Sequence, residues 1–227
     1  MSKEIQLQKF TNLLQIAREL NPVSEAPKNI LKKATLPPRK LLSRDEFEST
    51  LQEYKVPQEV IEKIELVNIE FRGFDNKIHQ GQIAVHKKLK HSIKKIFMRI
   101  KNETDFPFSS VDLMDRFDWN DHTSIAHNNT SGFNWRFVFG TMEISDHAVG
   151  GAIDINSYLN PWVKDGIITR PYNPKAPGTL HASSVVVQIF KDEGWSWGGD
   201  WKKSKDWQHF YRPDIPYEEF GKAETAE

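Results

Sequence analysis

One stretch, SDHAVGGAIDIN at residues 145–156, constrains the fold of this chain more than any other. It sets a histidine and an aspartate around a pair of glycines, in a run that is otherwise largely apolar. If the end of this stretch forms a strand, alternate side chains face opposite sides, so the isoleucines pack in the core while Asp154 points into a cleft. The glycines permit a tight turn that can bring His147 back beside Asp154.

Two interpretations of this pair are open: two ligands of a metal ion, or a core histidine followed by a surface aspartate. The chain has no cysteine, which excludes disulfides, cysteine nucleophiles and thiolate zinc sites. Any transition-metal site must therefore be built from histidine and carboxylate side chains.

A second polar cluster, DWQHF at residues 206–210, lies further along the chain. Asp206 and His209 are three positions apart, a spacing that places side chains on one side of a helical turn or lets them converge in a tight loop. His209 as a third ligand would leave one position of a zinc ion open, as catalytic zinc sites require. Asp206 could then take a proton from water at the metal without itself binding the metal.

The charge balance of the chain limits its partners. Lys+Arg and Asp+Glu both total 31, so the formal net charge is zero, and no global positive field holds nucleic acid or an anionic membrane. No run approaches the roughly 18–20 apolar residues of a membrane span. The N-terminus shows no uninterrupted apolar segment and no small-residue cleavage site, so no secretory signal is expected. As written, the chain is expected in the cytoplasm, or at the cell wall if a leader was removed or lysis releases it.

Residues 1–60 are expected to form a helical N-terminal extension and linker, followed by a catalytic domain over residues 61–227. Apolar residues near the N-terminus repeat as in an amphipathic helix, and four prolines interrupt residues 22–43. Ser43 and Glu46 have the spacing of a capping box that begins a further helix.

The rest of the chain mixes strand and helix patterns. Residues 64–74 alternate loosely, as a strand does, and residues 82–102 are expected to form an amphipathic helix. Its lysine-rich face is either solvated or able to contact an anionic polymer, and His79, His86 and His91 on or beside it are expected to face solvent. Further short strands are expected at FNWRFVFG (133–140), GAIDIN (151–156) and WQHFYR (207–212), with a helix at SSVVVQIFKDEG (183–194) that Gly194 ends. These elements favour the α+β class.

Residues 128–162 and 192–210 together resemble the zinc D-Ala-D-Ala carboxypeptidases, the VanY-like peptidases. Related proteins are the phage L-alanyl-D-glutamate endopeptidases and the vancomycin-resistance D-Ala-D-Ala dipeptidases. The family pattern Ser-x-His-x6-Asp is met by Ser145, His147 and Asp154, the later acid-x-x-His by Asp206 and His209, and an upstream arginine by Arg136. The resemblance spans about residues 64–212, and residues 1–60 have no counterpart.

The resemblance implies a Hedgehog/DD-peptidase fold, in which helices flank a small antiparallel sheet. It also implies Zn²⁺ as the cofactor, and it assigns the metal and acid/base roles. The implied zinc ligands are His147, Asp154 and His209, with Asp206 as the general acid/base.

The resemblance further implies that Arg136 and Ser145 hold the carbonyl or the terminal carboxylate of the substrate. Trp207 is expected to contact substrate. For the tryptophans of this region as a group, two alternatives are open: they pack the core and a lid, or they stack on substrate. These residues are Trp195, Trp197, Trp201 and Trp207. Asp200 is either a hydrogen-bond partner of a ligand histidine or a surface residue. Asp146 stands where many relatives carry a neutral residue, and it adds negative charge near the site.

The sequence therefore predicts a zinc metallopeptidase, a D,D- or L,D-carboxypeptidase that acts on peptidoglycan stem peptides as a monomer. Its partners are expected to be peptidoglycan peptides or muropeptides, and neither nucleic acid nor a membrane. Two alternatives stay open: an L-alanyl-D-glutamate endopeptidase, and a non-catalytic zinc-containing binding module like the Hedgehog signalling domain. A metal nuclease is suggested only by DHTSIAHNN at residues 121–129, and the zero net charge disfavours it.

Overall fold

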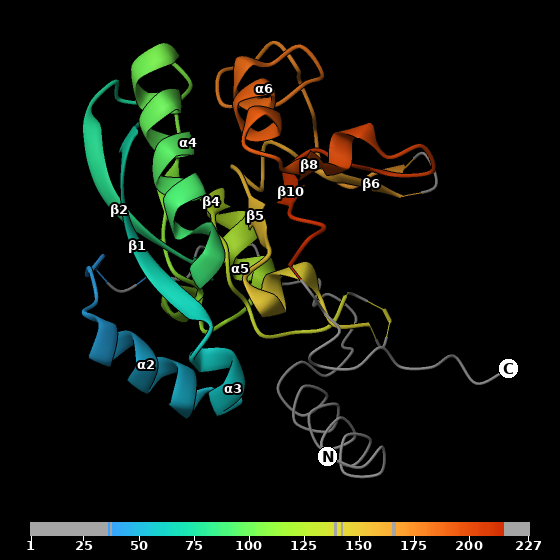
Figure 1. Ribbon diagram of the computed structural model, residues 1–227. Coiled ribbons are helices and arrows are strands. Elements are labelled where there is room, and N and C mark those ends of the chain that lie inside the picture. The colour runs from blue at the N-terminus through green and yellow to red at the C-terminus, as the bar shows by residue number, and fades with distance from the viewer. Residues whose placement is uncertain (1–35, 37, 139, 142, 165–166, 216–227) are drawn as a thin grey trace, which may run out of the picture.

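The computed structural model describes residues 36, 38–138, 140–141, 143–164 and 167–215 of the chain (Figure 1). The helices are α2 (Arg44–Glu53), α3 (Gln58–Ile61), η1 (Lys87–Leu89), α4 (Lys90–Glu103), η2 (Met114–Phe117), α5 (Asp121–Ala126), η3 (Asp146–Val149), α6 (Val185–Asp192) and η4 (Gly198–Asp200), where η marks 3₁₀ helices. The strands are β1 (Ile64–Arg72), β2 (Ile78–His86), β3 (Ser110–Val111), β4 (Asn129–Thr130), β5 (Ala152–Asp154), β6 (Trp162–Lys164), β7 (Ile167–Ile168), β8 (Ser196–Trp197), β9 (Lys205–Asp206) and β10 (His209–Tyr211).

The first half of the described chain is built on one long antiparallel hairpin. Strands β1 and β2 pair along their whole length, with Ile64 opposite His86 at one end. Helix α4 lies along this hairpin (Figure 1). Only one stripe of an amphipathic helix can face a sheet, and the buried residues of α4 follow that spacing: Ile93, Ile96, Phe97 and Ile100.

The helix expected over residues 82–102 begins later than predicted, at Lys90. Residues up to His86 continue strand β2, and the short turn η1 joins the strand to the helix. Ile83 and Val85 are fully buried and pair with β1, as β-branched side chains favour a pleated strand. The prediction was wrong here because the apolar residues of the strand run on into those of the helix without a break.

His86 is buried, contrary to the expectation that it faces solvent, whereas His91 is exposed. The backbone N–H of His86 donates to the carbonyl of Gly150, and its Nδ1 accepts the N–H of Lys88. Burial, with the charges of nearby lysines, lowers the pKa of His86 to about 4. The imidazole is therefore neutral in the folded protein near neutral pH.

Helix α2 begins with the predicted capping box. The Oγ of Ser43 accepts the N–H of Glu46 at 3.2 Å, and Oε2 of Glu46 accepts the N–H of Ser43 at 2.8 Å. Phe47 and Leu51 of this helix are buried in one hydrophobic cluster with the hairpin and α4. The described part of the expected N-terminal extension thus packs on the core. Residues 1–35 lie outside the described residues, and the division at residue 60 stays a prediction.

Two small antiparallel sheets carry the second half. In one, β10 lies between β5 and β8, and helix α6 packs on it through Phe190, whose ring stacks on Phe210 at a centroid distance of 4.0 Å. In the other, β6 lies between β7 and β9. Gly194, with a φ of 79°, follows α6 at the predicted end of that helix.

The strand expected over residues 133–140 does not form. Among its described residues, only Phe137 makes a β-bridge, to Ile144. The backbone instead bonds to neighbouring segments. For example, Phe133 donates its N–H to the carbonyl of Ala84 in β2. The segment is thereby fixed against the hairpin without belonging to a sheet.

The mixture of helices with small sheets confirms the predicted α+β class. The Hedgehog/DD-peptidase fold itself stays a prediction. Within the described ranges, no helix combines the length and the apolar character needed to cross a membrane.

The buried imidazole of His86 predicts a loss of stability in acid. Its pKa is about 4 in the folded protein and about 6.5 in an unfolded chain. Between these values the unfolded chain binds more protons, so the free energy of unfolding falls as the pH decreases from about 6.5 towards about 4. His86→Asn keeps an acceptor for the Lys88 N–H and removes the titrating group, so it should reduce this loss by on the order of 2 kcal/mol.

Urea unfolding at about pH 7 and about pH 4.5 measures the effect. The matched control is His91→Asn, at an exposed site, which should keep the pH dependence of the wild type. The same acid-side loss in His86→Asn as in the wild type would contradict the assignment.

Candidate active site

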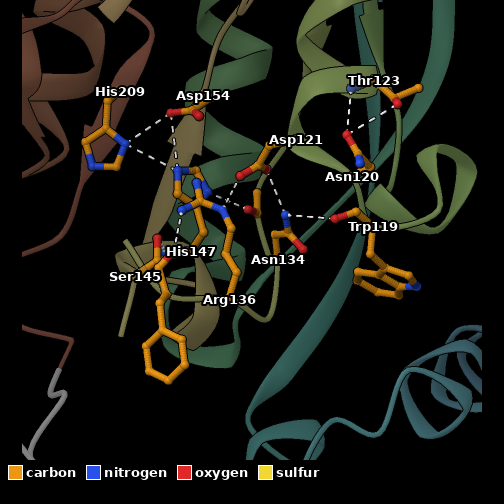
Figure 2. A network of polar contacts seen from close by, with 12 residues as sticks. Trp119, Asn120, Asp121, Thr123, Asn134, Arg136, Ser145, His147, Asp154 and His209 are labelled. Atoms are coloured by element: carbon orange, nitrogen blue, oxygen red, sulfur yellow. Dashed lines mark hydrogen bonds and ion pairs between the residues drawn. The ribbon is translucent and has the colours of Figure 1, made fainter. Parts of the chain in front are cut away.

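The three side chains predicted as metal ligands, His147, Asp154 and His209, converge in the structure (Figure 2). Nε2 of His147 lies 3.3 Å from Nδ1 of His209 and 3.3 Å from Oδ1 of Asp154, and the last two atoms are 3.0 Å apart. A tetrahedral zinc ion with ligand distances of about 2.0–2.1 Å spaces its ligand atoms about 3.3–3.4 Å apart. The three donor atoms are therefore placed as one face of such a tetrahedron.

A short turn carries His147 into the site. Ser145 precedes the turn, and its Oγ accepts the backbone N–H of His147 at 3.3 Å. The turn ends at Gly150, whose φ of 67° is a left-handed conformation that glycine adopts without strain. A Cβ at Gly150 would lie 2.4 Å from the backbone nitrogen of His86, so the chain can pass so close to strand β2 only with glycine there.

Strand pairing sets the other two ligands side by side. Asp154 ends β5 and stands directly opposite His209, the first residue of β10. The next pair, Ile153 and Phe210, is fully buried. Because a slip of one residue would turn these apolar side chains to the opposite face, the core fixes the register that brings Asp154 to His209.

Polar groups behind the ligands orient both imidazole rings. Nδ1 of His147 lies 2.7 Å from the carbonyl oxygen of Gly132, which can only accept, so Nδ1 carries a proton and Nε2 is the nitrogen that a metal ion would bind. Nε2 of His209 lies 3.5 Å from Oδ2 of Asp146, which leaves Nδ1 of His209 facing Asp154. Metal-binding histidines commonly donate their second ring N–H to a carbonyl or carboxylate in this way.

The ligands form a buried cluster of opposite charges. Burial alone would raise the pKa of Asp154, but the charges and hydrogen bonds of His147 and His209 hold it well below its usual range. Burial lowers the pKa of His209, but hydrogen bonds and charge from Asp146 and Asp154 outweigh this effect and raise it to about 10. Such a set of two imidazoles and one carboxylate fits a divalent cation, whose binding displaces the ring proton.

Asp206 ends strand β9, where it pairs with Trp162 of β6. The residue is partly exposed, but its Oδ1 is buried and has no hydrogen-bond partner among the described residues. Burial and, next, the charge of Asp154 raise the pKa of Asp206 to about 7. A carboxyl group with this pKa can both take up and release a proton near neutral pH.

Arg136 reaches the site from the irregular segment in front of the His147 turn. Its carbonyl accepts the N–H of Ser145, and nearby Asn134 donates its N–H to the carbonyl of His147. The Nε of Arg136 forms an ion pair with Asp121, and its Nη1 donates to the carbonyl of the next residue (Figure 2). The structure thus brings Arg136 beside the ligands with its charge already partly compensated.

The tryptophans separate into two groups. Trp195 and Trp197 are buried in the core, as one of the two alternatives predicts. Trp207 is only partly buried, and one face of its ring stacks on Tyr172 at a centroid distance of 3.9 Å. The hydroxyl of Tyr172 donates to the carbonyl of Leu180, which holds the pair in place. Contact of Trp207 with substrate stays a prediction.

Asp200 lies on the surface and is not a hydrogen-bond partner of a ligand histidine. Its carboxylate pairs with Lys191 at 2.7 Å, and half of its side chain is exposed. The carboxylate beside the ligand ring of His209 is Asp146 instead. In the part of the chain that the structure describes, the histidines of segment 121–129 belong to no group of metal-ligating side chains.

Residues 140–212 match the model of a protein family described as D-alanyl-D-alanine carboxypeptidase. This segment contains all three candidate ligands together with Ser145 and Asp206, whereas Arg136 lies just before it. Comparison of the chain with curated proteins and with solved structures gave no match. The match to this peptidase family therefore covers the segment that contains the three candidate metal ligands.

Several groups around the site have no spacing signal in the sequence. They are the Gly132 carbonyl behind His147, Asp121 beside Arg136, Tyr172 against Trp207, and Arg170, which donates from Nη2 to the carbonyl of Ser157 at 3.0 Å. Each comes from a separate segment and has no fixed spacing to the residues it contacts. Only the folded chain brings them together.

The geometry of the cluster predicts that the protein binds one equivalent of Zn²⁺. Asp154→Ala and His209→Ala each remove one of three donors, so their affinity for Zn²⁺ should fall by more than about 100-fold. Calorimetric titration of each metal-free protein with Zn²⁺ measures this affinity. His91→Ala, which removes an exposed imidazole, is the control and should bind as the wild type does. Equal binding by the wild type and both ligand variants would contradict the site.

Proposed function

We propose that this protein is a zinc-dependent peptidase that hydrolyses the stem peptides of peptidoglycan, with removal of terminal D-alanine as its principal activity. The observation that carries the proposal is the convergence of His147, Asp154 and His209, with Asp206 near enough for the charges of Asp154 and both histidines to act on its pKa. The similarity of residues 140–212 to D-alanyl-D-alanine carboxypeptidases supports the substrate class. Zn²⁺ held by the two imidazoles and the carboxylate would supply Lewis-acid activation of a water molecule and of the scissile carbonyl.

Asp206 would move the proton in this reaction. Hydrolysis of a peptide bond takes a proton from water, and the leaving nitrogen must receive one as the C–N bond breaks. With a pKa of about 7, Asp206 can accept the first proton and deliver it to the nitrogen. A cation bound to Asp154 would lower the pKa of Asp206. More of this carboxyl group would then be ionised, which is the form that accepts the proton. Its buried Oδ1 is not engaged by another described group.

Arg136 and Ser145 would hold the substrate carbonyl. A guanidinium stays charged throughout the reaction and can stabilise the negative charge that develops on the carbonyl oxygen. Asp121 fixes Arg136 by its ion pair and in turn accepts a hydrogen bond of 2.8 Å from Nδ2 of Asn134. The hydroxyl of Ser145 accepts the His147 N–H, so its own hydrogen is available to a substrate oxygen.

An L-alanyl-D-glutamate endopeptidase would use the same machinery and is the second candidate. A non-catalytic zinc-binding module is disfavoured by Asp206. Burial of this carboxyl group costs stability, and a module that only binds has no need of a proton acceptor beside its metal.

Asp206→Asn keeps the shape of the side chain and removes its titrating group. The zinc-loaded variant should still bind one equivalent of metal, while its turnover of muropeptides falls by at least about 100-fold. Mass spectrometry of the digested muropeptides measures turnover and product together. Loss of a single alanine identifies a carboxypeptidase, and release of a longer peptide identifies an endopeptidase.

Asp200→Asn is the matched control, because this carboxylate pairs with Lys191 on the surface, and it should leave turnover unchanged. Wild-type turnover by Asp206→Asn would refute the role of Asp206. Absence of any product from the zinc-loaded wild type would refute the peptidase and favour the binding module.

A further inference from the structure

Arg170 lies beside the candidate active site without having been predicted there. It follows strand β7, and Thr169 just before it bonds to the carbonyl of Trp162 through both its N–H and its hydroxyl. Trp162 pairs on its other side with Asp206. The three-stranded sheet β7-β6-β9 thus places Thr169, the residue before Arg170, and Asp206 on either side of one residue.

A second contact links Arg170 to the segment that follows β5, the strand of Asp154. Its Nη2 donates to the carbonyl of Ser157 at 3.0 Å, and Ser157 follows closely after Asp154 on the chain. Ser157 is itself fixed, since it is buried and its N–H and hydroxyl both donate to the carbonyl of Asn129. Arg170 is therefore held between the segment that follows Asp154 and the sheet that contains Asp206.

The hydrogen-bonding capacity of Arg170 is only partly used. Its Nε is buried and has no hydrogen-bond partner within the described ranges, and among the described residues no carboxylate forms an ion pair with it. A buried N–H without a partner costs free energy. Burial lowers the pKa of Arg170, which the charges of Asp206, Tyr158 and Asp154 oppose. The group is therefore a partly desolvated cation that interacts with the charges of Asp206 and Asp154 and has one donor that no described group uses.

Arg136, the other arginine at the site, also has a buried Nε without a hydrogen bond among the described residues, but it differs in having a carboxylate partner. Asp121 already forms an ion pair with its Nε, so its positive charge is partly compensated before any ligand arrives. A ligand that carries a full negative charge gains more from an arginine without such a partner.

We propose that Arg170 binds the terminal carboxylate of the substrate, while Arg136 serves the scissile carbonyl. The planar fork of a guanidinium matches a carboxylate with two parallel hydrogen bonds, and a carboxylate would satisfy the orphaned donor. The assignment rests on the proposed peptidase function and deepens it, because it makes a free C-terminus next to the scissile bond the feature that the site recognises. It therefore favours carboxypeptidase over endopeptidase action.

The test compares two substrates that differ only at the C-terminus: an N-acetylated L-Lys-D-Ala-D-Ala tripeptide and its C-terminal amide. With zinc-loaded protein, Arg170→Gln should lower kcat/KM for the acid by about 100-fold, the value of a lost charge-assisted hydrogen-bond pair, and change that for the amide by less than about 3-fold. Arg170→Lys keeps the charge but loses the planar fork. Its kcat/KM for the acid should therefore lie between those of the wild type and Arg170→Gln. Lys175→Gln, an exposed cation of the same segment, should leave both substrates unchanged.

Equal loss on acid and amide would overturn the proposal, because it would mean that Arg170 only balances the charge of its neighbours. Equal use of acid and amide by the wild type would overturn it as well. Circular dichroism of each variant checks that it is folded. If Arg170→Gln does not fold, the same comparison of acid and amide is made with Arg170→Lys.

Calorimetric binding of the same two peptides to metal-free protein separates this proposal from the proposed function. Suppose that the wild type hydrolyses neither peptide but binds the acid more tightly than the amide, and that Arg170→Gln loses this preference. The carboxylate site is then supported and the proposed peptidase function is refuted. If neither peptide binds, or the preference survives in Arg170→Gln, the carboxylate site falls.

Discussion

The structure depends on one buried carboxylate, Asp154, held between two imidazole rings. An ionised carboxylate out of water is stable only with positive or hydrogen-bonding partners. His147 and His209 supply them at 3.3 Å and 3.0 Å, and together the three groups form a donor set that a divalent cation would satisfy. The carboxylates of Asp146 and Asp154 beside His209 raise its pKa.

The core of the protein keeps these three side chains in place. Ile153 and Phe210 pair beside Asp154 and His209, so the apolar interior determines which polar residues meet. The turn of His147 is tied to the N-terminal hairpin, because the carbonyl of Gly150 accepts the N–H of His86. The Gly132 carbonyl behind His147 belongs to a segment that also bonds to strand β2, so the hairpin supports the site from behind.

The sequence predicted what short spacings encode. The His147-x6-Asp154 stretch with its glycines and the Asp206-x-x-His209 pair marked the candidate residues, and the capping box of Ser43 marked the start of α2. These signals work because the turn, the strand and the cap each need particular residue types at fixed separations.

Contacts between distant segments had no such signal. The helix expected over residues 82–102 included the end of a strand, since apolar periodicity does not separate a buried strand from an adjoining helix. The segment around Arg136 has strand-forming residues but joins no sheet: its backbone bonds to Ala84 of strand β2 and to residues in and before the His147 turn. Asp121 and Arg170 reach the site through tertiary packing alone, so their positions in the sequence give no reason to choose them.

X-ray absorption spectroscopy at the zinc edge of the zinc-loaded protein tests the central claim most directly. The structure predicts a first coordination shell of nitrogen and oxygen at about 2.0–2.1 Å, with the outer-shell scattering of two imidazole rings, from His147 and His209. One ring should disappear in His209→Ala. A zinc ion surrounded only by oxygen atoms, or one whose spectrum is unchanged by that substitution, would contradict the account.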